Sequence, residues 1–565
     1  MLKVTKRNGN LVPFDINRIE TAINKAFRSC GIVWQDEVVK DIARNVKIWE
    51  GISVEDIQDQ VEELLMDYDY PQVAKEYILY RAKHSKLNYF VDSKLNFISN
   101  YINSDNTANA TIDDNSNVAN RNIAVLNSEI HKEDNREVNL RMLRDKVKEL
   151  YPEFNYKQMD IDFNTIAYLH DSSSQIGMPY CVAITMYPFL INGIRDLGGL
   201  SAAPKNIDSF CGMFINLVFA IASQFKGAVA TPGVLLCMDW FLRKEWGDNY
   251  YQKSDIIISS EHCLRQQTIK GQIHQYFQQI VYSLMQPSGS RGNQSVFWNL
   301  SIFDKPFFNT MYGDFYFPDG SKPQWESLQW LQKDFLHWFN QERLKCILTF
   351  PVVSLCLIYQ DNKFVDEDLY EFACQEYSEG NSFFTYISDS ADSLSSCCRL
   401  SSKISKPQFN FTNGQLSEMT GSKNVITLNL NRIIQDYFKT VDTNYFGASG
   451  TLYKDITEED MHGFKEYLVD ILDRIYKYQI AYNECLKYLK ENKLLPVYDA
   501  GFIDMKKQYL TIGINGLNQA WEYLGGKCNK NKEYEEFCNL IFTTIKEQNQ
   551  LHKTKELMFN TEFTP

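Results

Sequence analysis

The sequence holds 565 residues, which is too long for one ordinary hydrophobic core and predicts at least two domains, one of them large. Hydrophobic residues make up 44% and aromatic residues 14%, so a densely packed interior is expected rather than disorder. The formal net charge of −13, without a long basic run, argues against a protein that binds nucleic acid through its phosphate backbone. A small phosphorylated ligand is not excluded, because a few basic side chains in one pocket suffice for it.

The first residues show no apolar leader, and the most apolar stretch, about 211–241, is interrupted by polar residues. Asn216, Gln224 and Lys226 would each be costly at membrane depth, so a buried core helix is predicted there rather than a membrane span. Without an export signal we expect a cytoplasmic protein whose 13 cysteines are thiols rather than disulfides. No CxxC pair occurs, so no metal site is predicted within the chain.

The N-terminal 86 residues are predicted to form a compact unit of their own. A turn at Asn8-Gly9 between two short strands predicts a hairpin. Apolar residues then recur at helical spacing over 16–27. Ser53 is placed to cap another helix, and Pro71 suits the first turn of a helix over 72–81.

A polar stretch rich in Asn, Ser and Asp follows and predicts a linker or arm over 91–140. Beyond it, helical and strand-like segments alternate, with clear strands predicted at 347–359 and 425–434. In the second strand one face is apolar and the other carries Thr427, Asn429 and Asn431. Such a strand suits a barrel whose interior holds a polar ligand, and it suits a solvated sheet face equally well.

The N-terminal unit resembles the ATP-cone domain of ribonucleotide reductases, through VTKRNG at its start, GISVEDIQ in its middle and VAKEYILYRAKHSK at its end. An isolated Lys-Arg pair would be an ordinary solvated pair, but this one lies within the whole pattern. The resemblance implies that ATP or dATP binds here as an allosteric effector. Charge-assisted hydrogen bonds to its phosphates would come from Lys6 and Arg7, joined by Arg18 and, by position, Gln58.

The remainder resembles the anaerobic (class III) ribonucleotide reductases, over segments that include YLHDSSSQIGMPYC, IASQFKGAVAT, SVFWNLSIFD, LTFPVVSL, SDSADSLSSCCRL, VITLNLNR and the final NTEFTP. The resemblance implies an α/β fold with a ten-stranded α/β barrel of the glycyl-radical and ribonucleotide reductase type, preceded by a small, mostly helical ATP cone. The expected domains are the cone at 1–90, the linker or arm at 91–140 and the catalytic barrel at 141–565. The expected activity is the anaerobic reduction of ribonucleoside triphosphates for deoxyribonucleotide synthesis and DNA replication.

That reaction begins when a thiyl radical removes the 3′-hydrogen of the ribose, which requires a sulfur held against one sugar carbon in a site closed to water. Family position places the thiyl residue directly before an arginine in a serine-rich loop, which selects Cys398 over its neighbour Cys397. Cys181 falls where the family places the second sulfur, and Asn429 would hydrogen-bond the ribose hydroxyls. His170-Asp171 is interpreted as structural, because neighbours on a strand point to opposite faces.

The family's radical glycine, in a motif like RxxGY, and its four-cysteine zinc site are not found in these 565 residues. We therefore expect a truncated chain, or one part of a split enzyme that is completed by a separate C-terminal fragment. The resemblance also implies a homodimer and a radical-SAM iron–sulfur activating enzyme, with formate or a thioredoxin-like protein as reductant. Neither membrane nor direct nucleic-acid binding is expected.

Two alternative functions remain at this point. A nucleotide-binding regulatory remnant would keep the cone without catalysis, but it has no need of Cys398, Cys181 and Asn429 together. A glycyl-radical lyase shares the barrel, but it has no use for an ATP cone.

Overall fold

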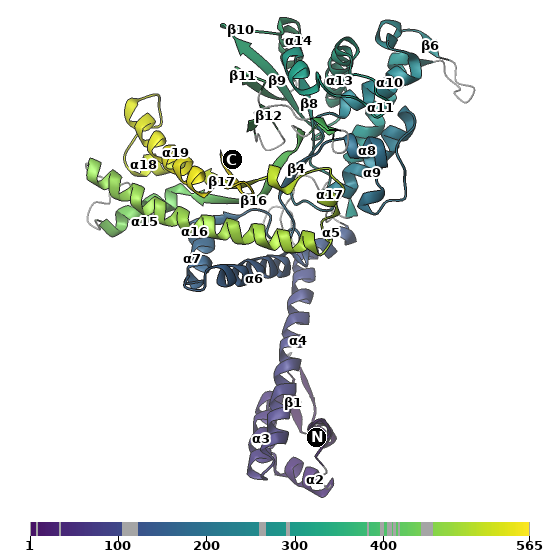
Figure 1. Cartoon of the computed structure of the whole chain (residues 1–565). Coiled ribbons are helices and arrows are strands. Elements are labelled where there is room, and N and C mark those ends of the chain that lie inside the picture. The colour runs from purple at the N-terminus through teal and green to yellow at the C-terminus, as the bar shows by residue number, and fades with distance from the viewer. Residues whose placement is uncertain are drawn as a thin grey trace. The chain divides into compact units, whose positions relative to one another are not determined.

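The chain divides into two compact units, Met1–Ile112 and Asp113–Pro565, which are described one at a time. The computed structural model (Figure 1) describes residues 2–6, 10–32, 36–103, 122–258, 267–289, 294–380, 383–391, 393–395, 401–403, 409–410, 414–415, 418–441 and 456–563.

Unit 1 is a small hairpin followed by four helices that share one hydrophobic core. The antiparallel strands are β1 (Lys3–Thr5) and β2 (Leu11–Pro13), and the helices are α1 (Ile16–Cys30), α2 (Asp36–Asn45), α3 (Val54–Asp67) and α4 (Pro71–Asn103). Ser53 caps α3 as predicted, since its hydroxyl accepts the backbone N–H of Asp56 at 3.0 Å. The hairpin and the helices are therefore confirmed, while the turn at Asn8-Gly9 lies outside the described residues.

Helix α4 begins at Pro71 as predicted but continues far beyond residue 81, to Asn103. The reason is visible in the sequence, because no Gly or Pro occurs between residues 72 and 103 to end the helix. The predicted linker or arm thus carries helix near both of its ends, since α5 (Ile123–Glu129) and the start of α6 (Lys132–Leu150) also fall within 91–140.

Unit 2 is built on one ten-stranded mixed sheet with helices packed on it (Figure 1). Its strands are β3 (Ala167–Leu169), β4 (Cys181–Ala183), β5 (Val229–Ala230), β8 (Trp298–Phe303), β9 (Val352–Gln360), β10 (Lys363–Phe364), β11 (Phe384–Ser388), β16 (Thr420–Asn429), β17 (Tyr509–Asn515) and β18 (Met558–Phe563). One parallel set runs β4-β5-β8-β9-β11, and a second runs β16-β17-β18. The two sets meet antiparallel where β4 pairs with β16.

The predicted α/β class and the count of ten strands are confirmed. Closure into a barrel is not seen, because within the described residues no pairing joins β18 to the opposite edge at β11 or β10. The sheet is therefore open along that seam in the part of the chain described.

Helices of unit 2 cover the sheet and contribute most of its core. Besides α5 and α6 they are α7 (Lys157–Thr165), α8 (Tyr187–Asn192), α9 (Ile207–Ala222), α10 (Val234–Trp246), α11 (Ile269–Leu284), α12 (Lys305–Tyr312), α13 (Trp325–Lys345), α14 (Glu367–Ser378), α15 (Leu430–Val441), α16 (Glu458–Glu491), α17 (Pro496–Asp499), α18 (Leu517–Tyr523) and α19 (Lys532–His552).

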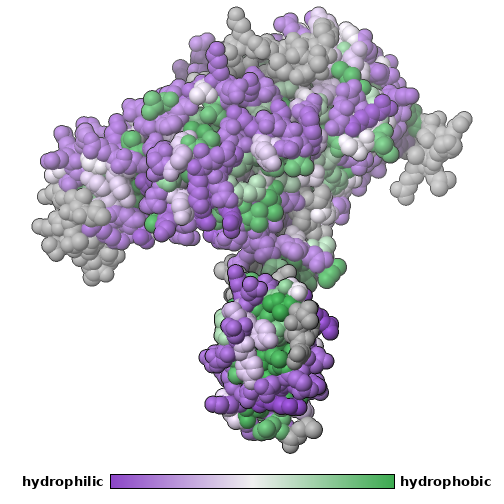
Figure 2. All heavy atoms as spheres, turned by 60° about the horizontal axis from the view of Figure 1, so that its bottom comes forward, coloured by the Kyte–Doolittle hydropathy of each residue, from purple (hydrophilic) through white to green (hydrophobic). Residues whose placement is uncertain are grey.

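The apolar stretch 211–241 was predicted as one buried core helix, and it is buried, but it spans α9, strand β5 and α10. Polar and glycine residues between the two helices, Ser223 and Gly227 among them, end the first helix and allow the chain to enter the sheet. Within the described residues, no helix combines the length and apolar character needed to cross a membrane. On the face shown in Figure 2, hydrophilic side chains predominate and hydrophobic ones form small, scattered areas.

The two predicted strands exist with shifted bounds. The first, expected at 347–359, is β9 and begins only at Val352. The second, expected at 425–434, is β16, which starts at Thr420 and ends at Asn429, where helix α15 begins. The side chain of Asn429 explains this end, because its Oδ1 accepts the backbone N–H of Arg432 at 3.1 Å, as a helix cap does.

The two faces of β16 differ as predicted, and both are buried over most of its length. Ile426 and Leu428 lie in the main hydrophobic core. A β-bulge between Ser422 and Asn424 brings Ser422 to the same face as Thr427. On this polar face, Ser422 is fully buried and Thr427 is only 6% exposed. A solvated sheet face, which the sequence pattern allowed equally, is therefore not supported.

Candidate active site

Cys181 lies at the junction between the two parallel strand sets, as the first residue of β4. It is fully buried and packs with Ala228, Tyr180 and Phe297. Its neighbour across the antiparallel junction is Ser422 of β16. The predicted second sulfur is thus held rigidly, in the middle of the sheet.

The strands approach each other closely at this junction because β16 has a glycine there. A Cβ atom added at Gly421 would lie 2.3 Å from the carbonyl oxygen of Cys181, so no larger residue fits. Gln508 fixes the same carbonyl by donating its side-chain N–H at 3.0 Å. The position of Cys181 is therefore determined by both the backbone register and a buried amide.

Cys397 and Cys398, the predicted thiyl pair, lie outside the described residues, but the strands on either side are described. β12 (Ser393–Ser395) pairs antiparallel with β13 (Ser401–Lys403), so the two strands that flank this segment lie side by side. β12 lies beside β9 of the main sheet.

Hydroxyl and amide groups form a buried row across β16, β17 and β18 next to the Cys181 junction. The Ser422 hydroxyl is 2.9 Å from that of Thr511, and Thr511 donates to Oδ1 of Asn560 at 2.8 Å. Ser422 and Thr511 are both fully buried. The row provides donors and acceptors together on the polar face of the sheet, which suits a ligand that carries hydroxyl groups.

Asn429, the predicted ribose-binding residue, is not near Cys181. It stands seven residues beyond Ser422 on the same strand, and at about 3.3 Å per residue this is roughly 20 Å. One ribose cannot reach both side chains at this separation, so the structure does not bring Cys181 and Asn429 together. The residue of β16 that the structure brings to Cys181 is Ser422.

Asn429 instead lines a second cavity, of about 400 Å³, with Asn515, Thr427 and His170. Nε2 of His170 is hydrogen-bonded to the Thr427 hydroxyl at 2.7 Å. Burial lowers the pKa of His170 to about 4, so the imidazole is neutral near pH 7. The imidazole thus bonds to the neighbouring strand β16 through Thr427, as a residue with a structural role would.

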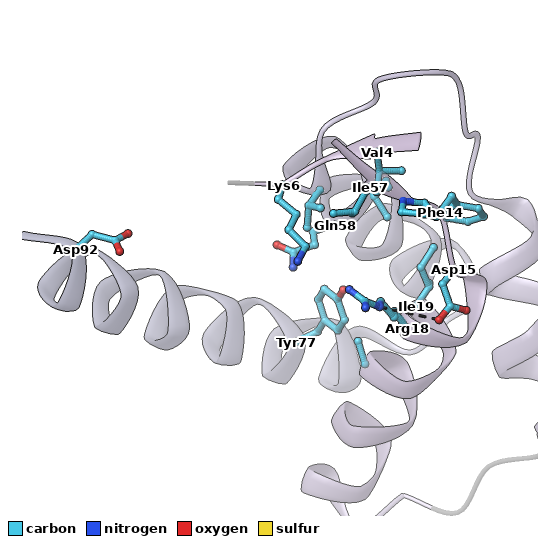
Figure 3. Close-up of a pocket in the computed structure, with 14 residues that line it drawn as sticks. Val4, Lys6, Phe14, Asp15, Arg18, Ile19, Ile57, Gln58, Tyr77 and Asp92 are labelled. Carbon is cyan, nitrogen blue, oxygen red and sulfur yellow. Dashed lines mark ion pairs between the residues drawn. The ribbon is translucent and has the colours of Figure 1, made fainter. Parts of the chain in front are cut away.

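Unit 1 contains its own cavity, of about 520 Å³, a volume in the range of small-ligand sites. Three of the four predicted effector residues line it, namely Lys6, Arg18 and Gln58. Figure 3 shows their side-chain ends converging near Tyr77 of α4. The fourth, Arg7, lies outside the described residues.

The cavity combines two exposed cations with an apolar wall formed by Val4, Ile19 and Ile57. Asp15, which also lines it, accepts the Asn17 backbone N–H at 3.0 Å as the cap of α1, and lies 3.9 Å from Nε of Arg18. Cations for phosphate beside apolar surface for a base are what a nucleoside triphosphate requires.

Several residues of these sites were not predicted from the sequence: Ser422, Thr511, Asp15 and Tyr77. The role of Asp15 as a helix cap could have been predicted, because an Asp directly before a helix is a common helix-start signal. Tyr77 looked like any apolar helix residue, and Ser422 becomes visible only through the pairing of β16 with β4.

Comparison with known protein families gives two matches. A family model described as "Anaerobic ribonucleoside-triphosphate reductase" matches residues 114–565, which is most of the chain. A model described as "ATP cone domain" matches residues 2–86.

Solved structures similar to the chain include the anaerobic ribonucleotide reductase from Thermotoga maritima with citrate in the active site, at 26% identity and a TM-score of 0.66, covering 84% of this chain and 77% of that one. The same enzyme in complex with dATP and CTP matches at 27% identity and a TM-score of 0.64, covering 78% and 68%. Among curated proteins, the vitamin B12-dependent ribonucleoside-diphosphate reductase of Mycobacterium tuberculosis is 43% identical over 89 residues, which is 15% of this chain and 13% of the relative. The subunit alpha of Chlamydia trachomatis ribonucleoside-diphosphate reductase is 34% identical over 94 residues, 14% of this chain and 9% of the relative.

Proposed function

Because the chain belongs to the anaerobic ribonucleoside-triphosphate reductase family, we propose that it takes part in reducing ribonucleoside triphosphates to deoxyribonucleotides by thiyl-radical chemistry. ATP and dATP would control this activity through the cone. The observation that carries the proposal is the buried thiol of Cys181 at the sheet junction, beside a buried row of hydroxyl and amide groups.

In this proposal Cys398 is the thiyl residue, with Cys397 as the less favoured neighbour. The β12–β13 hairpin supports the choice, since it would present the segment between them at its tip. A glycyl radical, expected on a separate C-terminal fragment, would oxidise the thiol of Cys398. The Cys398 sulfur then takes the 3′-hydrogen of the ribose and later returns a hydrogen atom to the same carbon.

Cys181 would act on the 2′ side of the sugar. Loss of the 2′-hydroxyl as water needs one proton, which a thiol can donate, and the net reduction needs two electrons from formate or a thioredoxin-like protein. Ser422 takes the ribose-binding role first assigned to Asn429, because it is the polar residue of β16 opposite Cys181. Its neutral hydroxyl can both donate and accept, as the sugar hydroxyls require.

We place the cone at residues 1–90 and the catalytic domain at 141–565. The expected partners are a radical-SAM iron–sulfur activating enzyme, a separate C-terminal fragment with the radical glycine and zinc site, and a second copy of the chain in a homodimer. A cytoplasmic location follows from this assignment.

The catalytic proposal is tested by anaerobic turnover of the chain with a complementing fragment and its activating enzyme. Cys398→Ser and Cys181→Ser should each abolish deoxynucleotide formation, while Cys374→Ser, at an exposed thiol of α14, should keep it. Turnover that survives in Cys398→Ser would show that another sulfur carries the radical.

The effector proposal is tested by calorimetry on the full chain with ATP and dATP. Lys6→Ala should weaken binding of both nucleotides by about tenfold, the loss of one charge-assisted contact. Lys40→Ala is the matched control, because Lys40 is an exposed lysine of the same unit that pairs with Glu37 at 3.4 Å. The chain could bind ATP and dATP and still show no turnover with any complementing fragment. That result would favour the alternative of a nucleotide-binding regulatory remnant.

A further inference from the structure

Helices α13 and α14 of unit 2 pack against each other, and α14 also contacts strand β10. Near their ends they face each other with polar side chains, His337, Asn340 and Gln341 from α13 and Glu376 and Glu379 from α14. Side-chain hydrogen bonds join His337 and Asn340 to Glu376, and Gln341 to Glu379.

Glu376 is a buried carboxylate, 1% exposed, with both oxygens held in place. Oε1 is 2.8 Å from Nδ1 of His337, and Oε2 accepts the side-chain N–H of Asn340 at 2.7 Å. Within the described residues no Lys or Arg forms an ion pair with it. A buried carboxylate without a permanent cation is costly, and a cation bound at this position would offset that cost.

The helix ends add to the negative potential at the same place. Glu376 lies in the last turn of α14 and Glu379 is its C-cap, while that turn has no basic residue. The C-terminal end of a helix carries partial negative charge, which disfavours carboxylates and favours cations. Two carboxylates at this end are therefore unfavourable unless a cation joins them.

The ligand-capable atoms of His337, Glu376 and Glu379 all lie within 4.8 Å of one another. We propose that they bind one first-row divalent ion, such as Zn²⁺ or Co²⁺, with water completing the coordination. One imidazole nitrogen and two carboxylates suit such an ion, with bonds of roughly 2.0–2.2 Å. Glu379 is exposed at a helix end and can move in to reach that distance.

The neighbouring amides fit this assignment. Asn340 orients the Glu376 carboxylate and Gln341 donates to Glu379 at 3.2 Å, as outer hydrogen bonds orient ligating carboxylates in metal sites. The ion would replace the His337–Glu376 hydrogen bond by two coordinate bonds and fasten α14 to α13. The earlier expectation of no metal rested on the lack of CxxC pairs, which does not bear on a site of His and Glu.

The experiment uses the full chain, stripped with a chelator and titrated with Co²⁺ by visible absorption and with Zn²⁺ by calorimetry. We expect one ion per chain and a rise in melting temperature on binding. Glu379→Gln should weaken binding about tenfold or more, and His337→Gln should remove the Co²⁺ absorption bands. Glu371→Gln, at an exposed carboxylate of the same helix, should bind like the parent.

Glu379 is exposed, so its variant should fold even if changes at His337 disturb the helix pair. Equal affinity in Glu379→Gln and the parent would overturn the proposal. So would the absence of binding at one equivalent, which would leave the hydrogen bond between His337 and Glu376 without a metal role.

Discussion

A buried carboxylate beside the start of β16 provides a direct test of the electrostatics of unit 2. Glu418 is 3% exposed and accepts a short hydrogen bond from the Tyr312 hydroxyl. It also lies close to the start of α10, where a Cβ atom added at Gly233 would lie 2.4 Å from Glu418 Oε1. Burial disfavours the charged form and raises the pKa of Glu418 to about 7.

The size of the effect follows from the difference between this pKa and the ordinary value of 4.5. At about 1.4 kcal/mol per pKa unit, the difference corresponds to about 3.5 kcal/mol. The folded protein holds the proton more tightly than the unfolded chain does. The stability that the protonated group contributes is therefore fully present below pH 4.5 and is lost as pH rises through about 7.

Glu418→Gln replaces the titrating group by a neutral one of the same shape. Relative to the parent, the variant should gain up to about 3.5 kcal/mol in free energy of unfolding between pH 4.5 and pH 8. Urea denaturation followed by circular dichroism at both pH values measures this gain. Glu245→Gln, at an exposed carboxylate of α10, is the control and should follow the parent at both. If the stability difference between Glu418→Gln and the parent were the same at both pH values, the argument from burial would be refuted.

Three further predictions, two of them with a matched second variant, test the packing of the two units. Gly513→Ala should lower the free energy of unfolding, measured by urea denaturation, by roughly 1–3 kcal/mol, because the added Cβ would lie 2.1 Å from the Thr427 hydroxyl oxygen. Gly212→Ala is the control and should leave the free energy of unfolding unchanged, because its new Cβ meets nothing within 4 Å. Asn429→Ala should cost about 1 kcal/mol through the lost cap of α15, and Asn429→Asp should restore most of it. Phe27→Ala, at a fully buried ring of unit 1, should cost about 3–5 kcal/mol and abolish ATP binding in calorimetry, whereas intact binding would mean that the cavity does not depend on this core.

Local signals in the sequence predicted much of unit 1 correctly. The cap at Ser53 and the start at Pro71 depend on residues within one helical turn, so they can be read without the rest of the chain. Helix ends were harder to predict. The segment 72–81 was only the beginning of α4, because nothing in the following residues stops a helix.

In unit 2 the sequence predicted the class of the fold and the faces of its strands better than their ends. Alternation correctly separated the apolar and polar faces of β16, but it continued past Asn429 into a helix. The step from strand to helix is set by the side chain of Asn429 bonding to Arg432, and both conformations bury leucine and isoleucine there. Hydrophobicity alone therefore could not predict where β16 ends and α15 begins.

The same limit explains why Asn429 was chosen in place of Ser422. A period of two residues determines which face a side chain occupies, but it says nothing about where along the strand a distant segment will pair. That position is set by three residues of β4, whose pairing with Thr420, Gly421 and Ser422 brings Cys181 to one end of the polar face. Gly421 makes this register specific, because a side chain there would collide with the Cys181 backbone in this pairing. The position of Cys181 opposite Ser422 is thus determined by a glycine and a short strand. Neither carries a functional group that a motif search would select.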